Sequence, residues 1–201
     1  GFGAEIARRY VAESAKVAVA DMNEEGAKKV AAELGANAFA IKCDVTKRAD
    51  IDALVAATIK NFGTLDIVVN NAGYSHPNQP MLETDEATFD RVLDVNIKSI
   101  YLMSMATVPI LRAKKRGCII NIGSVSGMRP RPGLVWYSAS KAVKGSSTST
   151  PPTPAMTPST MASSAPVSMA SKPLSLAIPA AVADGSATNS TSTCLAWVAV
   201  R

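Results

Sequence analysis

The chain has 201 residues, of which 47% are hydrophobic, and its formal net charge is +5, so it can form one domain with a hydrophobic core. It has no apolar run long enough to span a membrane and no nucleic-acid-binding motif beside its modest positive charge, so we expect neither kind of partner. Its three cysteines lie far apart, without a metal-binding or disulfide spacing, and we expect no metal site and a reducing, cytoplasmic location.

Residues 1–145 alternate short apolar runs with amphipathic patterns, which predicts a parallel α/β sheet. A helix follows Gly1 and Gly3, and another helix opens at Trp136. A basic cluster, LRAKKRG, ends the long helix, where cations complement the helix dipole. The remaining predicted elements are strands at 16–21, 38–45, 65–73 and 118–127, helices at 24–35 and 47–63, and a long helix at 84–117 that bends near Pro109.

The composition changes sharply after Gly145. Of the 56 residues from Ser146 to Arg201, 38 are Ser, Thr, Pro or Ala, and only three are charged. Such a segment buries too little apolar surface to offset the conformational entropy lost on folding. We therefore separate a domain at 1–145 from a Ser/Thr/Pro/Ala-rich segment at 146–201, which we expect to be disordered or translated out of frame. A natural disordered tail is the alternative.

The start of the chain has features of a dinucleotide site. Glycines such as Gly1 and Gly3 let the backbone approach a pyrophosphate at a helix N-terminus, although an ordinary turn before a helix explains GFG equally well. Asp21 closes the next strand, where a carboxylate accepts hydrogen bonds from the ribose of NAD and repels the 2′-phosphate of NADP. The strand expected before Gly1, central in such a sheet, is absent, so we expect the sequence to be truncated at its start.

Two later strands end in residues suited to the same ligand, because open α/β sheets bind ligands at the carboxyl ends of their strands. Asp44, in CDV at 43–45, could reach an adenine amino group, or could simply cap the following turn. NNAG at 70–73 offers backbone amides and a glycine for close approach, although in isolation it could be only a turn.

Ser124, Tyr137 and Lys141 form a possible reactive set. Ser124 follows the strand at 118–127, and Tyr137 and Lys141 lie one helical turn apart on one helix face. A neighbouring ammonium favours the phenolate, so the phenol can exchange a proton with an alcohol or carbonyl while hydride moves to or from a nicotinamide. Ser124 could hydrogen-bond the same oxygen. A lone Tyr/Lys pair on a helix is usually plain surface, and only the ordered set is informative.

In their order, GFG, AD at 20–21, CDV, NNAG, VNIKS, INIGSVSG and YSASK resemble the classical short-chain dehydrogenase/reductase family over residues 1–145. The resemblance implies a partial dinucleotide-binding domain with a Rossmann-like, doubly wound parallel sheet and helices on both faces. The first strand and the last strands of that sheet are missing from this sequence. The family is usually a homotetramer.

The resemblance also implies roles for individual residues. Ser124 would orient the substrate, Tyr137 would be the acid/base, Lys141 would assist Tyr137 and hold the nicotinamide ribose, and Asn96 would hold a water of the proton relay. The cofactor would lie against a set that overlaps this one: Gly1, Gly3, Asp21, Asp44, Val45, Asn71, Ala72, Gly73, Tyr137 and Lys141.

We therefore expect an oxidoreductase that transfers hydride between NAD(H), less favourably NADP(H), and a small alcohol or carbonyl substrate. It would be similar to 3-oxoacyl-carrier-protein reductase or to glucose dehydrogenase. The alternatives are an inactive remnant with weak or no nucleotide binding, and another Rossmann-type enzyme such as a methyltransferase, against which the Ser/Tyr/Lys set argues. Of the substrate-side loops only 74–86 is recognisable, and we expect its histidine, His76, at the surface or the substrate rim.

Overall fold

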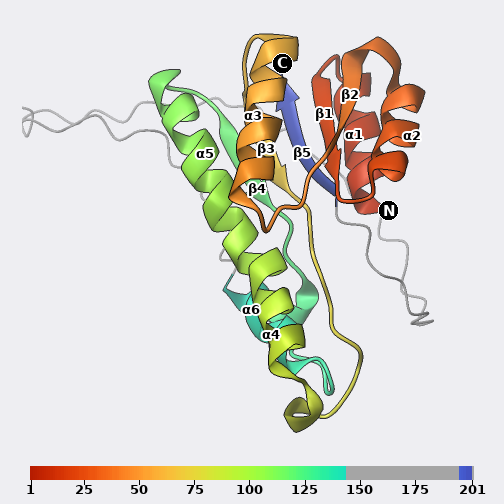
Figure 1. Ribbon diagram of the computed structural model, residues 1–201, viewed down its shortest axis with the longest axis vertical. Helices are drawn as coiled ribbons and strands as arrows, with labels where there is room; N and C mark the ends of the chain where they lie inside the picture. Colours follow the sequence, from red (N-terminus) through yellow and green to blue (C-terminus); the bar gives the residue numbers. More distant parts are fainter. Residues whose placement is uncertain (144–194, 201) are drawn as a thin grey trace, which may run out of the picture.

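Alternating strands and helices build a five-stranded sheet in the computed structural model, which describes residues 1–143 and 195–200 (Figure 1). The first half holds α1 (Phe2–Ala12), β1 (Lys16–Asp21), α2 (Glu24–Leu34), η1 (Gly35–Asn37), β2 (Ala38–Lys42), α3 (Arg48–Phe62) and β3 (Ile67–Asn70). The rest holds η2 (Met81–Glu83), α4 (Glu86–Leu93), η3 (Asp94–Lys98), α5 (Ser99–Ala113), β4 (Cys118–Asn121), η4 (Val125–Gly127), α6 (Val135–Ala142) and β5 (Leu195–Val200).

The strand order is β2-β1-β5-β3-β4. β1 pairs in parallel with β2, and β3 with β4, as the sequence predicts. β5 lies between β1 and β3 and runs antiparallel to both, with Lys16 opposite Val200 and Val69 opposite Trp197. The sequence analysis did not anticipate this strand, although the apolar run at 195–200 has the β-branched and aromatic residues that favour strands. The rest of the predicted disordered or out-of-frame segment lies outside the described residues.

Helices cover both faces of the sheet, which confirms the doubly wound α/β architecture (Figure 1). Side chains alternate along β1, because successive residues of a strand point to opposite faces. Val17 and Val19 pack with α1 and α2 on one face, and Ala18 and Ala20 pack with α3 and α5 on the other. Each apolar cluster is sealed by buried residues of its own helices, such as Ala7 of α1 and Leu54 of α3.

The four parallel strands all end at one edge of the sheet, and the predicted site residues follow from those ends. The backbone N–H of Cys43, just after β2, donates to the carbonyl of Asp21 at 2.9 Å. The Asn70 side chain, at the end of β3, donates to the Asn121 side chain, at the end of β4, at 2.8 Å. The ligand-binding edge expected for such a sheet is therefore formed by these strand ends.

The long helix predicted at 84–117 is interrupted, but not where the sequence suggested. Pro109 lies inside the continuous α5, and the irregularity is the π-helical turn η3 between α4 and α5. Such insertions add a residue to the helix and re-aim side chains, often at functional sites. Here the turn contains Asn96, whose side chain is fully buried.

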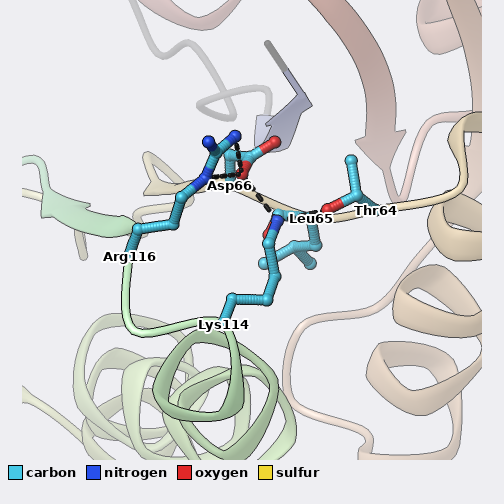
Figure 2. Close-up of polar contacts among 5 residues, drawn as sticks. All are labelled: Thr64, Leu65, Asp66, Lys114 and Arg116. Carbon is cyan, nitrogen blue, oxygen red and sulfur yellow. Dashed lines mark hydrogen bonds and ion pairs between the residues drawn. The ribbon is translucent and has the colours of Figure 1, made fainter.

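The basic cluster after α5 holds the helix end to the start of β3, at the edge opposite the strand ends (Figure 2). Lys114 Nζ donates to Asp66 Oδ1 at 2.6 Å, to the Leu65 carbonyl at 2.9 Å and to the Thr64 hydroxyl. Arg116 Nη2 donates to the same Asp66 oxygen at 3.1 Å. Two cations of the cluster are thus occupied by an internal carboxylate. No helix in the described part of the chain has the length and apolar character needed to cross a bilayer.

Candidate active site

Lys141 is buried, with 6% of the residue exposed, and its ammonium group faces the Tyr137 ring across one turn of α6. Nζ lies 5.6 Å from the ring centroid and 3.5 Å from the carbonyl oxygen of Ile122, just after β4. A Cβ placed on Gly73 would lie 3.2 Å from the same Nζ. The end of NNAG, the end of β4 and α6 therefore converge on this ammonium group.

Asn96 joins the NNAG segment to α6. Its Oδ1 accepts the backbone N–H of Tyr74 at 2.9 Å, and its Nδ2 donates to the Tyr74 carbonyl at 2.8 Å. Nδ2 also donates to Ser140 Oγ at 2.9 Å, and that hydroxyl donates to the Tyr137 carbonyl at 2.7 Å. The sequence did not predict that Ser140 links Asn96 to α6, since a serine within YSASK carries no signal of its own.

Ser124 is brought to α6 by the short η4 turn. Ser124 Oγ accepts the N–H of Ser126 at 3.2 Å and so begins the turn. The turn then packs on the backbone of α6 so tightly that a Cβ on Gly127 would lie 2.8 Å from the carbonyl carbon and oxygen of Lys141. The η4 turn that begins at Ser124 therefore contacts α6, which carries Tyr137 and Lys141 and is bonded to Asn96 through Ser140. A hydroxyl, a phenol and an ammonium are groups suited to proton exchange.

Asp21, at the end of β1, is buried with one oxygen unsatisfied. Only 2% of the residue is exposed; Oδ1 accepts the Asn23 N–H at 2.8 Å, whereas Oδ2 has no partner among the described residues. Burial raises the pKa of Asp21 above its ordinary value, against the opposing effect of the Asn23 and Met22 N–H groups. Oδ2 is therefore a candidate acceptor for a hydrogen-bond donor from outside the described residues.

The glycines that precede Asp21 lie at the start of α1. Gly1 is the N-cap, without a side-chain cap bond, and Gly3 is buried in the first turn. The first-turn N–H groups of a helix point outward and favour an anion.

Asp44 is held within its own turn. Its Oδ1 accepts the Thr46 hydroxyl at 2.7 Å and the Thr46 N–H at 3.1 Å, and Lys47 Nζ lies 3.6 Å from Oδ2. Partial burial raises the pKa of Asp44, but these Thr46 and Lys47 contacts outweigh it and leave the pKa below its ordinary value. These contacts support the alternative role of Asp44, in which it caps the turn that follows β2. Val45 and Ala72 are buried and Asn71 is half-buried at the same edge of the sheet.

The surface position considered for His76 is wrong. Only 3% of this residue is exposed, and its Nδ1 lies 2.7 Å from the carbonyl oxygen of Pro77. The loop that carries it is largely exposed but is bonded to other segments, for example through the Gln79 N–H, which donates to the Gly133 carbonyl at 3.0 Å.

The sequence model of the short chain dehydrogenase family matches residues 1–150. The chain is 49% identical to 4-formylbenzenesulfonate dehydrogenase from Comamonas testosteroni, over 71% of this chain and 58% of that protein. It is 40% identical to L-fucose dehydrogenase from Oryctolagus cuniculus, over 70% of this chain and 49% of that protein.

Among solved structures, a 3-ketoacyl-(acyl-carrier-protein) reductase from Brucella melitensis complexed with NADH is similar, with a TM-score of 0.61 and 40% identity. The likeness covers 63% of this chain and 54% of that one. The chain thus spans about half the length of the curated relatives it matches.

Proposed function

The chain belongs to the short chain dehydrogenase family, and on that premise we propose that it transfers a hydride between NAD(H) and a small alcohol or carbonyl compound. The observation that carries the proposal is the buried Lys141 ammonium group beside the Tyr137 ring. It lies where the segments after two parallel strands meet α6. A buried cation contributes little to apolar packing, whereas beside a phenol it can assist proton exchange.

In the oxidation direction, the substrate hydroxyl loses its proton to the Tyr137 oxygen while its carbon loses a hydride, so a carbonyl forms. The nicotinamide, when bound, accepts that hydride, or supplies it in the reverse reaction. The Lys141 ammonium would stabilise negative charge that develops on the phenol, and the Ser124 hydroxyl would bond the reacting oxygen. Asn96 holds the backbone of Tyr74 and, through its bond to Ser140, also holds α6. We include in the proposal the role implied by the family resemblance, in which Asn96 holds a water of the proton relay.

The chain's own residues fit a dinucleotide. The unsatisfied Oδ2 of Asp21 suits a ribose hydroxyl, and its negative charge would repel a 2′-phosphate, which favours NAD over NADP. The first turn of α1, from Gly1 to Gly3, would take the pyrophosphate, and Asp44 and Val45 would border the adenine. Asn71, Ala72 and Gly73 would line the nicotinamide half, beside Lys141.

Two substrate classes are supported by the names of relatives. The 3-ketoacyl-(acyl-carrier-protein) reductase favours an acyl thioester, and the L-fucose dehydrogenase favours a sugar or polyol, in line with the two expectations from the sequence. The homotetramer implied by the family resemblance stays a prediction. An inactive remnant is the competing function, since the chain spans about half the length of these relatives.

One experiment separates these functions. The purified chain is titrated with NADH and NADPH by the fluorescence of the reduced nicotinamide, and turnover is then followed by its absorbance with an aldehyde, a 3-oxoacyl thioester, an aldose and a polyol. We expect tighter binding of NADH and turnover that is lost in Tyr137→Phe with NADH binding retained. Tyr101→Phe, on an exposed face of α5, is the matched control. Binding without turnover in either protein would favour the remnant, and turnover that survives Tyr137→Phe would defeat the mechanism.

A further inference from the structure

His76 is the sole histidine of the chain, and its two ring nitrogens are in different situations. Nδ1 lies 2.7 Å from the Pro77 carbonyl oxygen, which can only accept, so Nδ1 carries a proton and donates it. In a neutral imidazole the other nitrogen is then an acceptor with a free lone pair. That nitrogen, Nε2, is buried and has no hydrogen-bond partner among the described residues.

An unsatisfied buried acceptor is uncommon, because leaving one unpaired forfeits the hydrogen bond that it makes with water in the unfolded chain. In the described part of the chain, two buried side-chain atoms are in this situation: Asp21 Oδ2 and His76 Nε2. The first lies at the end of β1, where the proposed function puts the cofactor ribose. The second lies in the loop that follows NNAG and needs a donor of its own.

The loop around His76 is bonded to Asn96 on one side and to the segment that precedes Tyr137 on the other. On one side the Tyr74 backbone is bonded twice to Asn96. On the other side the Gln79 N–H donates to the Gly133 carbonyl at 3.0 Å, four residues before Tyr137. His76 therefore lies in a short segment that is bonded to Asn96 at one end and to the residues before Tyr137 at the other. Figure 1 shows this yellow loop running from β3 past the blue-green α6.

The loop also packs closely against the segment that precedes Tyr137. The Asn78 side chain donates to the Pro132 carbonyl at 3.3 Å, and Gly133 has a positive φ of 73°. A Cβ on Gly133 would lie 1.9 Å from Asn78 Oδ1, so this contact requires glycine. The Trp136 indole N–H also donates to the Met81 carbonyl at 3.3 Å. The loop is thus bound to the segment that leads into Tyr137 at three points.

We propose that His76 Nε2 accepts a hydrogen bond from a second hydroxyl group of the substrate, an inference that rests on the proposed function. The preferred substrates are then polyols and hydroxycarbonyl compounds. Monohydric alcohols and simple aldehydes lack the second hydroxyl group, and a compound with an anion in that place has no proton to donate to Nε2. A site built to bond a substrate hydroxyl rejects the analogue that lacks it, because its own polar group is left unpaired.

The sole histidine allows a test that needs no turnover. The chain is labelled with ¹⁵N in histidine only, and the two imidazole resonances are followed during titration with 1,2-propanediol, a sugar alcohol or 1-propanol, with and without NADH. We expect the Nδ1-protonated tautomer, and an Nε2 resonance that moves with the diol and the sugar alcohol but not with 1-propanol. An Nε2 resonance that ignores every diol overturns the proposal and leaves an ordered water as its partner. Absence of NADH binding counts against the proposed function alone.

Two substitutions separate the nitrogens of His76. His76→Asn retains a donor near the Nδ1 position for the Pro77 carbonyl but loses Nε2, whereas His76→Gln places an acceptor near Nε2. In His76→Asn we expect kcat/KM for polyols to fall about 100-fold with little change for 1-propanol, and His76→Gln to recover most of that loss. An equal loss for both substrate types in both variants would assign His76 a purely structural role and overturn the proposal.

Discussion

The Lys141 ammonium group lies 5.6 Å from the centroid of the Tyr137 ring, on the same face of α6 and almost out of contact with solvent. A lysine loses hydration when it is buried, so its retention there requires a compensating interaction. This lysine contacts the carbonyl of Ile122 and the Tyr137 ring. We infer that the Lys141 ammonium group and the Tyr137 phenol are the reactive pair of the site.

Lys141→Met should therefore remove the charge while retaining most of the side-chain volume. We expect turnover to fall about 100-fold or more across the neutral pH range, because the reacting phenol loses the cation that stabilises its developing negative charge. The measurement is the pH–rate profile. Lys60→Met, on the exposed surface of α3, should keep the parent profile. An unchanged profile in Lys141→Met would separate Lys141 from proton exchange.

Asp21→Asn should gain stability relative to the parent as the pH rises to neutral, and should lose cofactor selectivity. Burial raises the pKa of Asp21, so the folded chain binds this proton more tightly than the unfolded chain, and the contribution to stability is lost as the pH rises from acid through the carboxyl range. The free energy of unfolding of the variant, relative to the parent, should thus rise between acid and neutral pH. Urea denaturation across that range measures it.

The same substitution should weaken NADH binding and lower the preference for NADH over NADPH, as measured by fluorescence titration. Asp52→Asn, at an exposed position of α3, is the control for both measurements. A relative stability independent of pH would indicate that the buried carboxylate already has a donor.

Much of this fold follows from the sequence because its strands and helices have distinct periodicities. β1, β2, β3 and β4 all lie within the predicted ranges, and the strand ends carry the predicted polar residues. The helix break at η3 could not be placed, since Pro109 is the only strong helix-breaking signal in that stretch and its position within α5 is tolerated. The burial of His76 could not be predicted, because its loop bonds through Asn78 and Gln79 to Pro132 and Gly133, far along the chain, and no local pattern indicates such contacts.

Asn96→Ala should destabilise the chain as well as the site. The substitution removes an acceptor for the Tyr74 N–H and a donor shared by the Tyr74 carbonyl and Ser140, all in a buried environment. We expect the free energy of unfolding to fall by about 2–4 kcal/mol, measured by urea denaturation. Asn61→Ala, which removes one exposed bond to the Ala57 carbonyl, should have little effect. Equal effects at the two positions would mean that the buried network contributes nothing of its own.

Asp66→Asn should loosen the end of α5 from the start of β3. The carboxylate is buried and receives Lys114 and Arg116 on one oxygen, so its neutral replacement leaves the partly buried ammonium without its ion pair (Figure 2). We expect a loss of about 2–4 kcal/mol in the free energy of unfolding, most of it from the Lys114–Asp66 pair, which should depend little on salt because both side chains are largely shielded; the exposed Arg116 should contribute little. NADH binding should persist, since the cluster lies at the far edge of the sheet. A strong salt dependence would contradict the buried geometry.

Gly127→Ala should separate Ser124 from Tyr137 without unfolding the chain. The added methyl group would meet the Lys141 carbonyl carbon and oxygen at 2.8 Å, and because these are backbone atoms of α6, the η4 turn has to move away. A displacement of about 1 Å in a reacting group can cost about 100-fold in rate, so we expect kcat to fall by that order. The thermal midpoint should fall as well, because the methyl group meets backbone atoms that cannot move without cost. Gly123→Ala is a matched control, since nothing lies within 4 Å of its new methyl group. A fall in kcat in both variants would trace the effect to the loop in general, and parent-like kcat in Gly127→Ala would show that the spacing between η4 and α6 does not set the position of Ser124.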